Sequence, residues 1–174
     1  MSLALRFQIL PEDLEARVKL ALQALREGKI SDIQAASFFF KYFFQRLYPM
    51  YRDTLEIATI IQDAVKNQIV GLIVPGLIDV TLHINTISDL QFTNGVNPKS
   101  PAMVFIDLQV VEEVILAKTN LAQALIQKKV KVKKLAEILK WLAPITTIQT
   151  EEMIEKVRDE DLIIINTNLQ EIGF

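Results

Sequence analysis

The segment Asn120–Ile145 changes its hydrophobic period twice within a short stretch, and this pattern constrains the fold more than any other part of the chain. Apolar side chains from Leu121 onward recur at helical spacing. Val130-Lys-Val-Lys133 then alternates apolar and polar residues, as a half-buried strand does. From Leu135 the helical spacing returns, and Pro144 makes further continuation costly. The segment therefore predicts a helix, a short strand and a second helix. Together these could enclose an apolar site that has one movable side.

The composition favours a single domain with much apolar surface. A chain of 174 residues can bury a sizeable core without disulfides, and its mean hydropathy of +0.27 suggests that something apolar is bound or shared. A net charge of −2 argues against a general nucleic-acid binder. The longest apolar run, residues 69–78, is too short to span a bilayer, and residues 1–10 do not resemble a secretory leader. We therefore expect a cytoplasmic protein.

Three helices are predicted in the N-terminal third. Pro11 and the acids after it suit a first turn, and Gly28 suits a helix end. A second helix is expected from Ser31 to Tyr48, where Pro49 interrupts it, and a third over residues 51–66. The second is apolar almost all round, so it is buried in its own chain, covers an apolar ligand, or forms a homodimer interface. The dimer would use Phe38, Phe39, Phe43 and Phe44.

Alternating residues in the middle of the chain predict three strands. These cover residues 80–84, 90–92 and 102–108, with strong turn chemistry at residues 94–98. Their short connections suit an antiparallel meander. A helix is expected from Val110. In the tail, residues 151–157 predict a short helix.

The apolar run 162–165 predicts a last strand, which would pair with the sheet edge or with another chain.

Charge is distributed unevenly near the C-terminus. Six lysines between Lys128 and Lys140 precede an acidic block of six residues from Glu151 to Asp161. The simplest interpretation is two solvated faces that attract one another. A sharper one is a basic rim for an anionic head group, with peripheral contact to a membrane surface.

The order of these elements resembles the sterol carrier protein 2 (SCP-2) family of lipid-transfer domains. The resemblance is sharpest at Pro101-Ala-Met-Val-Phe-Ile-Asp107 and continues through Lys118–Leu125, Ile126–Lys133 and the helix from Leu135 to Ile145. It covers residues 53–146 and rests on spacing and residue type. The glycines that usually flank the family's last strand are absent, and Gln127 and Lys134 lie in their place.

The resemblance implies an α/β (α+β) fold, with a small, mainly antiparallel curved sheet covered by helices around an apolar tunnel. It implies an SCP-2-like domain at residues 53–146. Residues 1–52 and 147–174 lie outside the family pattern, and their own residues predict a helical extension packed on the same domain and a C-terminal helix and strand tail. The tunnel would take fatty acids, acyl-CoA or other lipids. The implied lining residues, which would equally suit an ordinary core, are Val104, Phe105, Ile106, Ile115, Leu121, Leu125, Leu135, Leu139 and Leu142.

The sequence offers little for catalysis. His83 is the only histidine, no cysteine is present, and no serine lies in a nucleophile-elbow context. No phosphate-binding loop or clustered metal-ligand spacing occurs, so neither a cofactor nor a metal is expected. We therefore expect a non-catalytic binder of apolar ligands, which could also act as a carrier. The alternative is a structural or oligomerisation protein with a closed SCP-2-like core.

Overall fold

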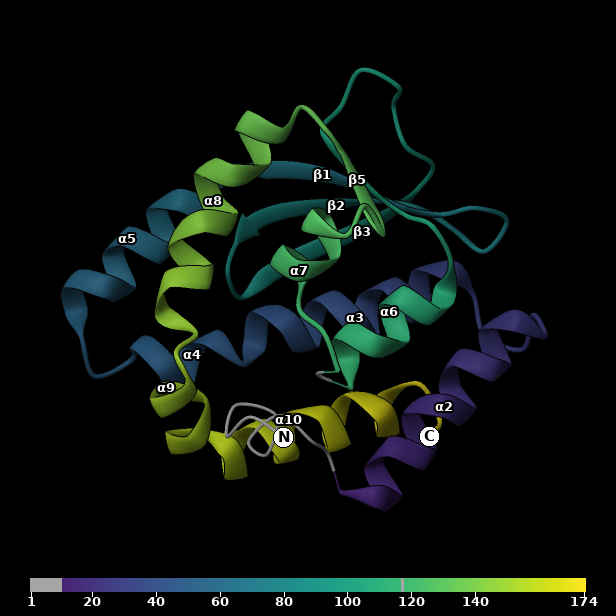
Figure 1. The fold of residues 1–174 in the computed structure, drawn as a ribbon, viewed down its shortest axis with the longest axis horizontal. Coiled ribbons are helices and arrows are strands. Elements are labelled where there is room, and N and C mark those ends of the chain that lie inside the picture. The colour runs from purple at the N-terminus through teal and green to yellow at the C-terminus, as the bar shows by residue number, and fades with distance from the viewer. Residues whose placement is uncertain (1–10, 117) are drawn as a thin grey trace.

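The computed structural model describes residues 11–116 and 118–174 and has an α+β architecture (Figure 1). Its five-stranded sheet has the order β3-β2-β1-β4-β5. Neighbouring strands are antiparallel except for β1 and β4, which are parallel, so the sheet is mixed and mainly antiparallel as expected. The strands are β1 (Gln68–Val74), β2 (Ile78–Thr86), β3 (Asp89–Asn94), β4 (Ala102–Phe105) and β5 (Val130–Lys133).

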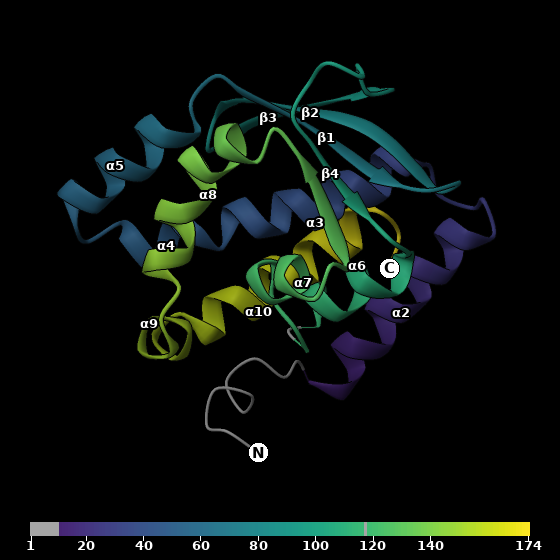
Figure 2. The same ribbon diagram turned by 45° about the horizontal axis from the view of Figure 1, so that its top comes forward.

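Helices account for most of the remaining described chain. Helix α3 packs against β2 and β3, α10 packs against α3, and α5 lies along α8. Figure 2 shows α3 running beneath the sheet, with α6, α7 and α10 beyond it. The helices are α2 (Glu12–Arg26), α3 (Asp32–Gln45), α4 (Leu47–Tyr51), α5 (Leu55–Val65), α6 (Leu108–Ile115), α7 (Leu121–Ile126), α8 (Leu135–Ile148), α9 (Glu151–Lys156) and α10 (Arg158–Glu171).

The core lies between the sheet and α3. On β2, Val80, Leu82 and Ile84 are buried toward the helices, whereas His83 lies on the opposite, wetter face with its ring 3.3 Å from the Thr93 hydroxyl. Helix α3 starts with a complete capping box, in which the Ser31 hydroxyl accepts from the backbone of Gln34 and the Gln34 side chain accepts from the backbone of Ser31.

The phenylalanines of α3 belong mainly to the interior. Phe38, Phe39, Phe40 and Phe44 are each at most 5% exposed, and Phe43 is partly buried. Burial in its own chain is therefore the role that the structure gives this helix. The homodimer expected through Phe38, Phe39, Phe43 and Phe44 gains no support from this arrangement.

The helix, strand and helix predicted between Asn120 and Ile145 are confirmed as α7, β5 and α8. The predicted end at Pro144 is wrong, because α8 continues to Ile148. Pro144 cannot donate to the carbonyl of Lys140, so α8 continues through the proline without this one intrahelical hydrogen bond. A similar correction applies to Pro49, which lies inside α4 and occupies its first turn, where no intrahelical donor is needed.

Two predictions for the strands are wrong. The strands at 80–84, 90–92 and 102–108 do not form a meander, because β4 pairs with β1 in parallel instead of with β3. Strand β1 itself was not predicted. It is central in the sheet and largely buried, so it lacks the alternation of a half-exposed strand. The third strand also ends early, at Phe105, because Asp107 caps α6 by accepting from the backbone N–H of Val110.

The strand predicted at residues 162–165 is also wrong, because these residues lie within α10. The buried residues of α10 follow helical spacing, because Ile165 is three and four residues from Asn168 and Leu169. The continuous apolar run at 162–165 did not reveal this spacing. Asn168 donates to the side chain of Gln45 on α3 at 2.9 Å, which gives this buried amide a partner on the neighbouring helix. The short helix expected at 151–157 is confirmed as α9.

Gly71 offers a test of the sheet packing. A methyl group at this position of β1 would collide with the side chain of Val96 and lie 3.1 Å from Cβ of Ala102. Because valine has little freedom to move aside, we expect Gly71→Ala to lower the free energy of unfolding by about 1–3 kcal/mol. Chemical denaturation of this variant and of Gly71→Ala/Val96→Ala would check it. The second substitution should restore part of the loss, and an unchanged Gly71→Ala midpoint would contradict the packing.

Candidate ligand pocket

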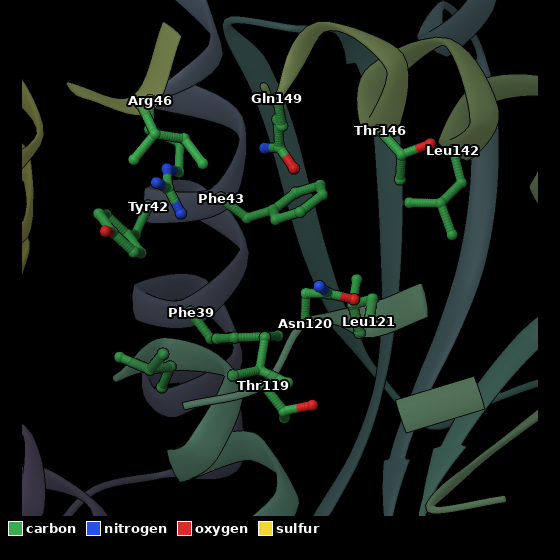
Figure 3. A pocket seen from close by; sticks show the side chains of 13 residues that line it. Phe39, Tyr42, Phe43, Arg46, Thr119, Asn120, Leu121, Leu142, Thr146 and Gln149 are labelled. Carbon is green, nitrogen blue, oxygen red and sulfur yellow. The ribbon is translucent and has the colours of Figure 1, made fainter. Parts of the chain in front are cut away.

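A pocket of about 280 Å³ lies between α3, the connection from α6 to α7, and the C-terminal part of α8 (Figure 3). Its wall is mainly apolar, with polar side chains from the α6–α7 connection and from the end of α8. Asn120 and Thr146 are exposed, so the pocket opens to solvent beside them. The lining residues are Phe39, Tyr42, Phe43, Arg46, Val114, Ile115, Thr119, Asn120, Leu121, Leu142, Thr146, Gln149 and Ile154.

Helical spacing explains how the two long walls are built. Phe39, Tyr42, Phe43 and Arg46 occupy positions i, i+3, i+4 and i+7 along α3 and its C-cap, so their side chains lie on one stripe. Leu142, Thr146 and Gln149 repeat the same spacing along α8 and its C-cap. The amide oxygen of Asn120 caps α7, because it accepts a hydrogen bond from the backbone N–H of Gln123 at 2.8 Å.

A largely buried polar cluster adjoins the α3 side of the pocket. Nε of Arg46 lies 3.2 Å from Oδ1 of Asp161, and these two side chains are only 17% and 13% exposed. The Tyr42 hydroxyl donates to Oδ2 of Asp161 at 3.0 Å. The Arg46 guanidinium also lies 5.3 Å from the centre of the Tyr42 ring, within range of a cation–π contact. The cluster therefore joins α3 to α10 and fixes the position of Arg46.

Burial dominates the titration of this cluster. It raises the pKa of the Tyr42 hydroxyl, which therefore stays protonated and can donate to Asp161 at neutral pH. Burial also raises the pKa of the Asp161 carboxyl, although Arg46 and the Tyr42 hydroxyl act in the opposite direction. Among the described residues, Nε of Arg46 and Oδ1 of Asp161 lack a hydrogen bond of good geometry. The pair is thus held by charge and proximity at a site that has spare hydrogen-bonding capacity.

The structure brings together three of the residues implied by the family resemblance. Ile115, Leu121 and Leu142 all line the pocket. Phe105 is buried deeper in the core, with its ring centre 6.3 Å from that of Phe39. The remaining positions, which do not line this pocket, are the partly buried Val104 and Leu125 and the exposed Ile106, Leu135 and Leu139.

The sequence allowed helix α3 to cover an apolar ligand as one of three roles, but none of the α3 residues that line the pocket was predicted as a lining residue. Phe39, Tyr42, Phe43 and Arg46 fall in the segment interpreted as an extension outside the lipid-binding domain. The i, i+3, i+4, i+7 spacing was a usable signal, because it places an arginine at the end of an otherwise aromatic stripe. Its acidic partner Asp161 was not identifiable, since nothing local in the sequence relates it to Arg46.

A second hollow, of about 700 Å³, lies between α3, the β2–β3 hairpin and α10. Its walls include Lys41, Tyr48 and Asp89 beside apolar side chains such as Ile163 and Ile164. None of the lining residues implied by the family resemblance lies in it. Its wall also carries a larger share of polar and charged side chains than the wall of the smaller pocket, so the smaller pocket is the better candidate for an apolar ligand.

The acidic block pairs with arginines from the N-terminal part of the chain. Asp161 contacts Arg46, and Glu160 accepts two hydrogen bonds of 2.7 Å from the guanidinium of Arg52. Among the six lysines between Lys128 and Lys140, Nζ of Lys129 lies 3.5 Å from Oε2 of Glu113 on α6. The charges of the acidic block thus help to hold α10 against α3 and α4.

Three further observations bear on the class of protein. The described part of the chain contains no group of three or more His, Cys, Asp or Glu side chains that could hold a metal ion. Of the helices described, none is both long enough and apolar enough to cross a membrane. Comparison with protein-family models, with curated proteins and with solved structures finds no match to this chain. The site must therefore be interpreted from its own geometry.

Proposed function

We propose that this protein is a cytoplasmic, non-catalytic binder of an apolar ligand such as a fatty acid or the acyl chain of acyl-CoA. The observation that carries the proposal is the pocket of about 280 Å³, in which Ile115, Leu121 and Leu142 meet the aromatic wall of α3. Its volume lies just below the range typical of small-molecule sites, which favours a slender ligand such as one acyl chain. The resemblance to SCP-2 domains points to the same ligand class.

The expected affinity comes from removing methylene groups from water. Each buried methylene contributes about 0.8 kcal/mol before the cost of immobilising the chain. No reacting group is needed for this function, and the polar side chains at the pocket would serve to orient the ligand. Exposed Asn120 and Thr146 mark the side through which a ligand could enter.

Blocking the pocket at Thr146 gives a direct test. Thr146 lines the pocket, whereas the neighbouring Thr147 does not, although both are exposed and both hydroxyls donate to the carbonyl of Ala143. We expect Thr146→Trp to fill the pocket and weaken binding of a fluorescent fatty acid by about tenfold or more, as measured by titration. Thr147→Trp is the matched control and should bind like the unaltered chain. Equal binding by both variants would place the ligand elsewhere.

The unaltered protein provides a second test. Gently purified full-length chain should release an acyl lipid on extraction, detected by mass spectrometry. If no lipid is released and added fatty acids and acyl-CoA also fail to bind, the proposed function is wrong.

A further inference from the structure

Arg46 gives the pocket a charged end. It is the one lining residue with a formal charge among those that the structure describes, and it stands between Tyr42 and the apolar wall of Phe39 and Phe43. Figure 3 shows its guanidinium group beside the Tyr42 ring. A charged group in a largely apolar pocket fixes the orientation of a ligand, because the matching ligand group must lie next to it.

The contacts of Arg46 leave donors for a ligand. Asp161 does not line the pocket, and its ion pair with Arg46 is made through Nε. Among the described residues, neither terminal nitrogen of the guanidinium forms a hydrogen bond with Asp161, whose Oδ2 accepts from the Tyr42 hydroxyl. Tyr42 stacks on the group at 5.3 Å and so restrains its plane. The forked edge formed by the terminal nitrogens matches the two oxygens of a carboxylate.

A second donor lies near this end of the pocket. Gln149, at the C-cap of α8, is partly buried, and Figure 3 shows its amide directed toward the space beside Phe43. From there an apolar chain could run along Leu142, Leu121 and Ile115, which also line the pocket. The pocket therefore has a donor-rich end and an apolar body.

We propose that Arg46 binds the carboxylate of the ligand, so that the protein selects apolar acids over neutral lipids of the same chain length. This inference rests on the proposed function. Asp161 offsets part of the charge of Arg46, so the selectivity should be moderate, about tenfold in affinity. The ligand class is a free fatty acid with its head group inside the pocket.

The test compares dodecanoic acid with dodecanol on the full chain by calorimetric titration. We expect the acid to bind about tenfold more tightly than the alcohol. If both bind with equal affinity, the role of Arg46 is wrong while the apolar pocket stands. If neither binds to the intact chain, the proposed function fails together with this inference.

Variants then assign the selectivity to Arg46. Replacing Arg46 alone would strand the buried Asp161, so the double variant Arg46→Met/Asp161→Leu is used because it removes both charges together. It should bind the two ligands about equally, through weaker binding of the acid. Arg52→Gln is the control, since Arg52 forms an ion pair with Glu160 outside the pocket. This control should keep the preference for the acid, and a double variant that also keeps it would overturn the assignment.

Discussion

Trp141→Ala is expected to lower the free energy of unfolding by about 3–5 kcal/mol, because it removes the largest buried side chain of α8. Trp141 is 1% exposed, and its ring lies 6.0 Å from that of Phe44 on α3. The substitution would leave a cavity between α3 and α8, the two helices that carry the long walls of the pocket. Chemical denaturation followed by circular dichroism would measure the loss.

Leu139→Ala is the matched control for this prediction. Leu139 lies on the same helix but is 41% exposed, so its truncation should cost less than about 1 kcal/mol. Equal losses for the two variants would contradict the described orientation of α8. They would also remove the basis for placing Leu142 and Thr146 in the pocket wall.

Asp161→Ala is expected to lower the free energy of unfolding by about 3–5 kcal/mol, because it leaves the largely buried Arg46 without its acidic partner. It also removes the acceptor of the Tyr42 hydroxyl. Asp159 lies in the same first turn of α10 but is exposed, so Asp159→Ala reports the contribution of helix charge alone. That control should change stability by less than about 1 kcal/mol.

A double variant completes the test of the buried pair. In Arg46→Met/Asp161→Leu neither charge is left stranded, so this variant should be more stable than Asp161→Ala. If Asp161→Ala instead matches Asp159→Ala in thermal and chemical denaturation, Arg46 and Asp161 do not form the largely buried contact described above.

Helices and strands with one buried face could be predicted from the sequence, whereas the pairing of distant strands could not. The switch of period between Leu121 and Leu142 identified α7, β5 and α8, because amphipathic burial leaves its period in neighbouring residues. Strand β1 gave no alternating signal, since it is central in the sheet and largely buried. Its parallel pairing with β4 depends on contacts between distant segments, which no short pattern records.

The same distinction applies to the pocket. Ile115, Leu121 and Leu142 were predictable as apolar faces of helices, although a core position and a ligand wall look alike in the sequence. Leu135 and Leu139 have the same character but face outward, 45% and 41% exposed. The tertiary arrangement of α8 decides between these outcomes.

The contact of Arg46 with Asp161 could not be predicted from the sequence, because the two residues lie in distant segments of the chain. Arg46 belongs to the N-terminal helices and Asp161 to the C-terminal tail, the two parts that lie outside the family resemblance. The structure joins them at the pocket through Tyr42, which contacts both. A charged end of the pocket thus arises from segments whose pairing could be known only after folding.

Methyl NMR spectroscopy of the full chain during titration with dodecanoic acid would show whether an apolar ligand occupies this pocket. Resonances of Ile115, Leu121 and Leu142 should shift and saturate together, because these side chains line the pocket. Resonances of the exposed Ile126, Leu135 and Leu139 should stay in place. Saturable shifts confined to Ile163 and Ile164 of the larger hollow, or no saturable shifts at all, would show that the ligand does not bind in this pocket.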